Sequence, residues 1–229
     1  MDRLARIIEA LAHDGEPDQA TYPQQVCAAS VGLLGVTGAG LTLMTKSELG
    51  EPGAVWASDE LAEKVEDVQF ALGEGPGLEA HHRGVPLLEP HLADMLARWP
   101  FFRPAALDLG VRAVFAFPLQ IGVIRLGALT LHRVDAGFLS DDELADALVL
   151  AHVATQDIVD LQAQGSLHWD LSHPRGRRAR VHQATGMIAA QLDSDMSTAL
   201  ACIRGYAFAY GSTIFDVAAD VIARRLRVK

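Results

Sequence analysis

Four arginines close together near the C-terminal end of the chain form the residue pattern best suited to binding another molecule. Arg175, Arg177, Arg178 and Arg180 stand within one short segment. A guanidinium group stays charged at physiological pH and pairs with phosphate or carboxylate through parallel hydrogen bonds. The pattern therefore indicates an anion site. The alternative is an ordinary solvated helix face that follows a soluble linker.

A second group combines a cation with aromatic rings. Arg204 precedes Tyr206 and Tyr210 in a segment with helical periodicity. Arginine and tyrosine side chains both stack on nucleic-acid bases, and RNA bases that are unpaired in a loop are open to such contacts. RNA is therefore the partner that this group indicates. An ordinary exposed helix surface explains the same residues equally well.

The sequence contains none of the short motifs that would indicate catalysis or a phosphate-binding loop. The nine histidines lack the spacing of a metal site, and Cys27 and Cys202 lie on or beside apolar helical stripes. The glycine-rich sequence GEGPG at residues 73–77 lacks the Lys and the Ser or Thr of a phosphate loop, so we interpret it as a turn. We predict no enzymatic activity, no cofactor and no metal site.

Charge divides the chain into two parts. Residues 1–174 hold 10 Lys and Arg against 25 Asp and Glu, a net −15, whereas residues 175–229 hold 9 against 4, a net +5. Eight of the acids lie between Asp135 and Asp170, a stretch without Lys or Arg. This division predicts an acidic regulatory domain joined to a small nucleic-acid-binding domain. We also expect the acidic stretch to restrain the arginines that follow it.

The rest of the composition is that of a folded cytoplasmic protein. Half of the residues are hydrophobic and 21% are charged. No run of about 18 apolar residues is present that would cross a membrane. The first residues lack the apolar core and cleavage site of a signal peptide. We therefore expect a cytoplasmic location and no membrane partner.

Hydrophobic periodicity indicates the elements that position these residues. Helical spacing is present in residues 2–12 and 23–34 and after Ser58 and Asp59, which are expected to cap the helix that follows them. Strand patterns are present in residues 39–45, 54–58, 85–89, 111–121 and 125–134. In the last of these, one face is apolar and the other is semi-polar, which is typical of an antiparallel sheet with helices on one side. We predict an α+β domain.

The longest helix is predicted for residues 140–164. Ser140 and Glu143 have the spacing of a capping box at its start. Residues then follow at alternating steps of four and three, as in a coiled-coil seam: Leu144, Leu148, Ala151, Thr155 and Ile158. We predict a homodimer joined through this helix, with help from residues 2–12. Packing on the domain core explains the two leucines equally well.

Residues 175–229 are predicted to form three helices after a linker at residues 165–174. Asp195 caps the second helix and Gly211 ends it. Thr213 caps the third. Three short helices bury little apolar surface. We expect three small residues to let the helices approach closely: Ala184, Gly186 and Ala199.

The sequence VHQATGMIAAQLDSDMSTALACIRGYAFAYGSTIFDVAADVIARRL closely resembles the ANTAR domain, a three-helix RNA-binding module of transcription antiterminators. The resemblance covers Val181 to Leu226. It rests on Q-A-x-G-M, A-L-x-x-I-R-x-x-A and D-V-A-x-x-V, which stand in the family's order and spacing. Thr185 and Ser212 replace residues that are usually basic in the family. The resemblance implies a C-terminal domain that binds RNA.

The preceding residues look like a GAF domain. The segments that carry this resemblance are GAGLTLMT, WASDELAEKVEDVQFALGEGPGLEA, RWPFFRPAALDLGVRAVFAFPL and LGALTLHR. Gly77 stands where related regulators often have a cysteine, so no cysteine-dependent sensing is expected there. The order of the two domains is similar to that of actinobacterial regulators. It implies a GAF-like antiparallel sheet with flanking helices in residues 1–164 and an all-α three-helix bundle in residues 175–229.

We therefore expect a signal-responsive transcription antitermination regulator that binds hairpin RNA. Its GAF domain would receive an unknown small-molecule or protein signal. The arginines would neutralise phosphate, Gln183 and Thr185 would give polar contacts, and Tyr206 would stack on a base. The residues expected to contact RNA are Arg178, Arg180, Gln183, Thr185, Arg204, Tyr206, Ser212 and Thr213.

Two other functions fit the same sequence. The first is a ligand-sensing or scaffold protein whose C-terminal bundle only dimerises. The second is binding of duplex DNA, because three small helices also build DNA-binding modules. Salt-dependent binding of hairpin RNA, without binding of duplex DNA, separates the main hypothesis from both.

Overall fold

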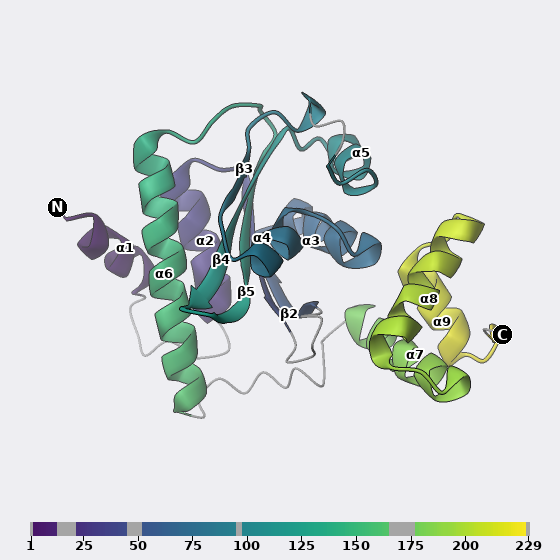
Figure 1. Cartoon of the computed structure of the whole chain (residues 1–229). Coiled ribbons are helices and arrows are strands. Elements are labelled where there is room, and N and C mark those ends of the chain that lie inside the picture. Colours follow the sequence, from purple (N-terminus) through teal and green to yellow (C-terminus); the bar gives the residue numbers. More distant parts are fainter. Residues whose placement is uncertain (1, 13–21, 45–51, 95–97, 165–176, 228–229) are drawn as a thin grey trace. The chain divides into compact units, whose positions relative to one another are not determined.

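The structure, a computed structural model, describes residues 2–12, 22–44, 52–94, 98–164 and 177–227 (Figure 1). The chain divides into two compact units, and the division falls between the helices α6 (Asp141–Ala163) and α7 (Arg177–Leu192). We call them the first unit and the second unit. The expected linker at residues 165–174 lies outside the described residues.

The first unit is built on a five-stranded antiparallel sheet within the described residues. The order β2-β1-β5-β4-β3 places the long β4–β5 hairpin and β1 at its centre. Each strand lies within a few residues of its predicted position, which confirms the expected sheet. The strands are β1 (Gly38–Met44), β2 (Pro52–Ala57), β3 (Leu87–Glu89), β4 (Ala113–Ile121) and β5 (Ile124–Arg133).

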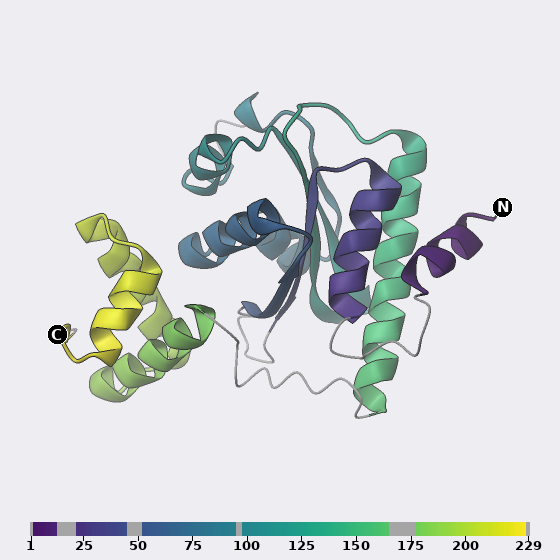
Figure 2. The same cartoon turned by 180° about the vertical axis from the view of Figure 1, so that it is seen from behind.

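Two helices cover one face of this sheet, α2 (Tyr22–Leu34) and α6, and α1 (Arg3–Leu11) packs on their outer side (Figure 2). Alternate strand residues such as Phe117 and Leu129 point toward them and form the larger apolar core. The predicted capping box starts α6. The Ser140 hydroxyl accepts the Glu143 N–H, and the Glu143 carboxylate accepts the Ser140 N–H.

The opposite face carries α3 (Glu60–Leu72), α4 (Pro76–Arg83) and α5 (Phe102–Asp108), with a short 3₁₀ turn at η1 (Leu92–Asp94) (Figure 1). Val65 of α3 and Phe102 of α5 pack there against Val114 of β4 in a second apolar cluster. The carboxylate of Asp59 caps α3 by accepting the N–H groups of Leu61 and Ala62. The cap is where the sequence predicts it.

The glycine-rich segment between α3 and α4 is a turn, as predicted. Gly73 ends α3 with a φ of 68°, in the left-handed region that favours glycine. Gly75 has a φ of 143° and stands just before α4, whose first residue is Pro76. The two glycines therefore allow the chain to turn between α3 and α4.

The seam predicted along α6 faces the core of its own unit. Ala151, Thr155 and Ile158 are buried in the first unit, and Leu144 is partly buried against the same core. The Thr155 hydroxyl donates to the Ala151 carbonyl, which satisfies this buried polar group. Leu148 is the seam residue that stays exposed. The interpretation of the seam as a dimer interface is therefore corrected, because the same spacing serves packing within one chain.

The second unit consists of α7, α8 (Met196–Tyr210) and α9 (Ile214–Ile222), so the three predicted helices are present. The carboxylate of Asp195 accepts the Thr198 N–H at the start of α8. Gly211 ends α8 with a φ of 63°. The core is made of aliphatic residues from all three helices, including Val181, Ile188, Leu200, Ile203 and Val217.

One expectation about this packing is wrong. A Cβ added at Gly186 would have no atom within 4 Å, apart from its own helix backbone and chain neighbours. The glycine therefore does not mark a close approach of two helices. Ala184 and Ala199, which are fully buried, are the small residues in the helix contacts.

Candidate functional site

The residues expected to contact RNA lie in the second unit, and six of the eight reach its surface at least in part. Arg180 and Gln183 are exposed neighbours on α7. Ser212 and Thr213 are exposed in the turn between α8 and α9. Arg204 and Tyr206 are half-buried on α8.

Arg178 and Thr185 require a correction, because both are buried. Arg178 is 6% exposed and Thr185 is 1% exposed. They stand three residues before and four residues after Val181, on the face of α7 that packs on the other helices. The Thr185 hydroxyl donates to the Val181 carbonyl at 2.7 Å. These side chains are therefore not available for direct contact with RNA in this structure.

Two aromatic contacts at one end of the second unit add to the predicted site. The rings of Tyr206 and Tyr210 stack with centroids 4.3 Å apart. The guanidinium of Arg177 lies over the ring of Phe215, 4.1 Å from its centroid. Tyr210 ends α8, and Phe215 is in the first turn of α9. The four-residue spacing of the tyrosines is a sequence signal for their contact, whereas no local pattern joins Arg177 to Phe215.

An acidic residue lies in the same region. Thr213 caps α9 by accepting the Asp216 N–H at 3.1 Å, and its hydroxyl donates to the Asp216 carboxylate at 2.7 Å. The Thr213 hydroxyl is therefore engaged in starting the helix. Because Asp216 is exposed, this end of the unit presents both charges together with aromatic rings.

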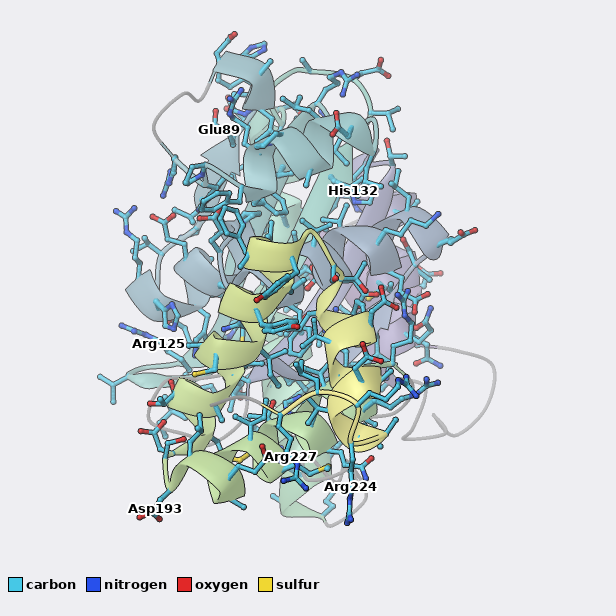
Figure 3. All side chains as sticks on the ribbon, turned by 90° about the vertical axis from the view of Figure 1, so that its right-hand side faces the viewer. Glu89, Arg125, His132, Asp193, Arg224 and Arg227 are labelled. Atoms are coloured by element: carbon cyan, nitrogen blue, oxygen red, sulfur yellow. The ribbon has the colours of Figure 1, made fainter. Side chains whose placement is uncertain are left out.

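A second group of cations lies at the opposite end of the second unit. Figure 3 shows Arg224 and Arg227 at the end where Asp193 precedes α8. Arg225 pairs with Asp220 at 2.7 Å. Cations after the last turn of α9 also complement the helix dipole. The positive charge of the second unit is thus divided between two places.

The first unit contains a buried polar layer between the sheet and α3. Thr42 of β1 donates its hydroxyl to Glu66 at 2.6 Å, and Gln69 donates its amide to the same carboxylate at 2.9 Å. The Gln69 carbonyl accepts the Gly77 N–H at 2.8 Å, and its amide approaches the Thr130 hydroxyl at 3.5 Å. All four polar side chains are buried. Since buried polar groups require such partners, the layer fixes α3 and the start of α4 on the sheet.

Glycines on β1 make room for this layer. A Cβ at Gly40 would lie 2.6 Å from the Glu66 side chain. A Cβ at Gly38 would lie 2.4 Å from the His132 ring and 2.7 Å from the Asp59 carboxylate. Polar side chains therefore lie directly on the backbone of β1. The sequence predicts the semi-polar face of β5 but not the glycines opposite it.

His132 is the least satisfied member of this face. It is 1% exposed, and its Nε2 has no hydrogen-bond partner among the described residues. Burial lowers the pKa of His132, and the charge of Asp59 opposes part of this effect. Partial burial would by itself raise the pKa of Asp59. Hydrogen bonds from Ser58 and two backbone N–H groups outweigh it and lower that pKa.

The described side chains give little support to thiol or metal chemistry. Cys27 is buried in the apolar core, as predicted, and burial raises the pKa of its thiol, which disfavours a reactive thiolate. Within the ranges that the structure describes, no three His, Cys, Asp or Glu side chains are placed to share a metal ion. The same ranges contain no helix with the length and apolarity of a membrane span.

Solved structures of GAF domains have a fold similar to that of the first unit. The GAF domain of a phosphoenolpyruvate-protein phosphotransferase from Coxiella burnetii is 18% identical, with a TM-score of 0.55 over 72% of this chain and 95% of that one. The GAF domain of an Acinetobacter phosphoenolpyruvate-protein phosphotransferase is 14% identical, with a TM-score of 0.54 over the same shares. A domain of a putative two-component sensor histidine kinase protein from Sinorhizobium meliloti is 17% identical, with a TM-score of 0.52 over 64% of this chain and 94% of that one.

These similarities confirm the predicted GAF fold. The sequence itself matches no family model and no curated protein. The structural similarities concern the GAF fold and give no support to an ANTAR domain, so the resemblance of residues 181–226 to that domain stays a prediction.

Proposed function

We propose that the chain is a cytoplasmic, signal-responsive regulator of transcription that binds hairpin RNA through its second unit and favours antitermination. The GAF fold of the first unit supports a sensing role, and one similar structure comes from a putative sensor kinase. Three helices at Arg177–Leu192, Met196–Tyr210 and Ile214–Ile222 agree with the three-helix architecture that the ANTAR resemblance implies. The chain would act by binding, without catalysis or a cofactor.

The observation that carries the proposal is the mixed cationic and aromatic surface of the second unit. Arg177 and Arg180 are exposed near the start of α7, and stacked tyrosines end α8. Cations attract the phosphate backbone, while aromatic rings accept unpaired bases. The net charge of +5 in residues 175–229 has the sign that RNA requires.

Antitermination would follow from a shift in RNA populations. The nascent RNA distributes between a terminator and a competing hairpin, and a protein that binds the hairpin stabilises it by its differential binding free energy. A tenfold shift requires about 1.4 kcal/mol. In this assignment Arg180 and Arg204 neutralise phosphate, Gln183 and Ser212 give polar contacts, and Tyr206 stacks.

We place the input of the regulator at the buried polar layer of the first unit. A small polar molecule or a protein that alters the hydrogen bonds of Glu66 or Gln69 would move α3 against β5. Arg133, at the end of β5, bonds the Glu143 carboxylate at 2.6 Å and the Leu34 carbonyl at 3.1 Å. This bonding gives a physical connection from the sheet to the start of α6.

Binding of labelled hairpin RNA by the full chain tests the proposal. The matched pair of variants is Arg180→Ala and Arg227→Ala, since both arginines are exposed, Arg180 on α7 and Arg227 after the end of α9. We expect Arg180→Ala to weaken binding by about 1 kcal/mol and to reduce the salt slope by about 1, with little effect of Arg227→Ala. Equal and small effects of the two substitutions would mean that these arginines lie near helix ends without contacting RNA.

We also propose that the chain forms a homodimer whose interface is not the seam of α6. The chain has a mass of 24.6 kDa, so light scattering at micromolar concentration distinguishes one copy from two. The scaffold alternative predicts a dimer that binds neither hairpin RNA nor duplex DNA at low salt. Binding of duplex DNA with equal affinity would instead favour the DNA-binding alternative.

A further inference from the structure

We propose that the end of the second unit where α8 passes into α9 binds unpaired bases of an RNA loop, with Tyr210 as the main stacking residue and Arg177 as the phosphate contact. The inference rests on the proposed RNA binding. It assigns that binding to two residues outside the set expected from sequence.

The tyrosine pair provides an open aromatic surface. Tyr210 is 68% exposed, yet its ring stacks on Tyr206 with an interplanar angle of 30°. The contact holds the exposed ring in place, so little side-chain entropy is lost when a base stacks on it. The outward face of an ordered ring suits any unpaired base, because every base has a π-face.

The arginine beside this surface is also held in place. Arg177 is exposed, but its guanidinium lies 4.1 Å from the centre of the Phe215 ring. Stacking on an aromatic ring leaves the guanidinium N–H groups in its plane free to meet a phosphate edge-on. The cation is therefore positioned at the end of the unit that carries the tyrosines.

Charge at this end favours a loop over a stem. The exposed carboxylate of Asp216 stands one residue after Phe215. A negative charge opposes the two closely spaced phosphate rows of a duplex more than the splayed backbone of a loop. Stacking on neutral bases is unaffected by it. The ligand is therefore expected to be a loop, and much of its binding energy is expected to persist at high salt.

The chain offers a matched control on the same helix. Phe208 is 71% exposed, close to the exposure of Tyr210. At 100° per residue, it lies roughly 160–200° around α8 from Tyr210 and Tyr206. Replacement of Phe208 removes a similar aromatic area from a different side of the helix.

The experiment uses the full chain and an RNA hairpin that carries 2-aminopurine in its loop, with the same stem as a blunt duplex without a loop. The wild-type chain should bind the hairpin in preference to the duplex and change the 2-aminopurine fluorescence. Tyr210→Leu should weaken hairpin binding by roughly tenfold and abolish that change, because one base stack is lost. Tyr210→Phe should behave like the wild type. Phe208→Leu should leave affinity and fluorescence unchanged.

Arg177→Gln gives an independent measurement. It should weaken hairpin binding at low salt while the fluorescence change at saturation persists, because the base contact remains. Circular dichroism of each variant shows whether the helices are intact, and Tyr210→Phe tests the ring when a larger change disturbs the fold.

The outcomes separate this inference from the function on which it rests. Absence of hairpin binding by the wild-type chain overturns both. Hairpin binding that Tyr210→Leu and Phe208→Leu affect equally, or not at all, overturns the stacking assignment and leaves RNA binding intact. A change in the light-scattering mass of Tyr210→Leu without RNA would assign the surface to contact between copies of the chain, which also overturns it.

Discussion

Two buried histidines give the first unit a defined response to acid. Burial lowers the pKa values of His132 and His81 below the ordinary value of 6.5. Asp59 opposes the effect at His132, whereas the charges of His82 and Arg125 add to it at His81. Below 6.5 the unfolded chain binds more protons than the folded one. The contribution of these two histidines to the stability of the fold is therefore fully present above pH 6.5 and falls as the pH drops below it.

His132→Gln should flatten this response, because one of the two groups can no longer bind a proton. The measurement is the urea midpoint of unfolding at about pH 7.5 and about pH 5.5, compared between variant and wild type. His152→Gln, at an exposed position of α6, is the control and should keep the wild-type pH dependence. A wild-type slope in the His132 variant would contradict the explanation.

Single residues show which parts of the site the sequence can predict. Asp59, Asp195 and Thr213 cap their helices as predicted, because a cap depends on residues within one turn. The burial of Arg178 and Thr185 could not be predicted in this way. It depends on which face of α7 meets the other helices, and a short amphipathic pattern leaves that face uncertain by one or two positions.

The attachment of α1 to α6 depends on a buried carboxylate. The Asp146 side chain is 5% exposed and pairs with Arg3 at 2.7 Å and with Arg6. Replacement of both arginines by glutamine leaves a buried charge without its cations. Because the arginines are themselves partly exposed, we expect a loss of about 1–3 kcal/mol in unfolding free energy. Hydrogen exchange of the Ile7 and Leu11 amides, both on α1, should rise.

A double-mutant cycle separates this charge effect from a general effect on α1. Adding Asp146→Asn to the double arginine variant should recover part of the lost stability, because the buried charge is removed. Asp142→Asn is the matched control, since Asp142 also pairs with Arg3 but is 88% exposed. It should change stability by less than about 1 kcal/mol. Equal losses for the two aspartates would contradict the role of burial.

At the level of elements, periodicity predicts type and position better than it predicts partners. The helix of residues 140–164 is present, yet its seam packs within the first unit. Apolar residues at alternating steps of four and three let a helix pack on a sheet of the same chain as well as on a helix of a second chain. The polar layer is hidden from sequence for a related reason. Gly40 and Glu66 meet only through the packing of α3 on β1, which no local pattern encodes.

At the scale of the whole chain, the structure weakens the expectation that the acidic stretch before the second unit restrains the arginines. Four of the six acids of α6 have partners inside the first unit: Asp142, Glu143, Asp146 and Asp157. Asp141 and Asp160 are exposed, and their carboxylates have no ion pair or hydrogen bond with described residues. Most of the charge on α6 that was expected to attract the arginines is therefore engaged elsewhere.

We accordingly expect only weak restraint of RNA binding by α6. Replacing Asp141 and Asp160 by Asn in the full chain should raise its affinity for hairpin RNA by about tenfold at most at low salt, because each surface pair contributes about 0–1 kcal/mol. The gain should shrink as salt rises, since screening weakens the attraction of these two carboxylates for arginines. Asp94→Asn with Asp108→Asn removes the same charge from other exposed positions of the first unit and is the control. An equal gain in both pairs would attribute the effect to net charge, and no gain at any salt concentration would show that α6 does not restrain RNA binding.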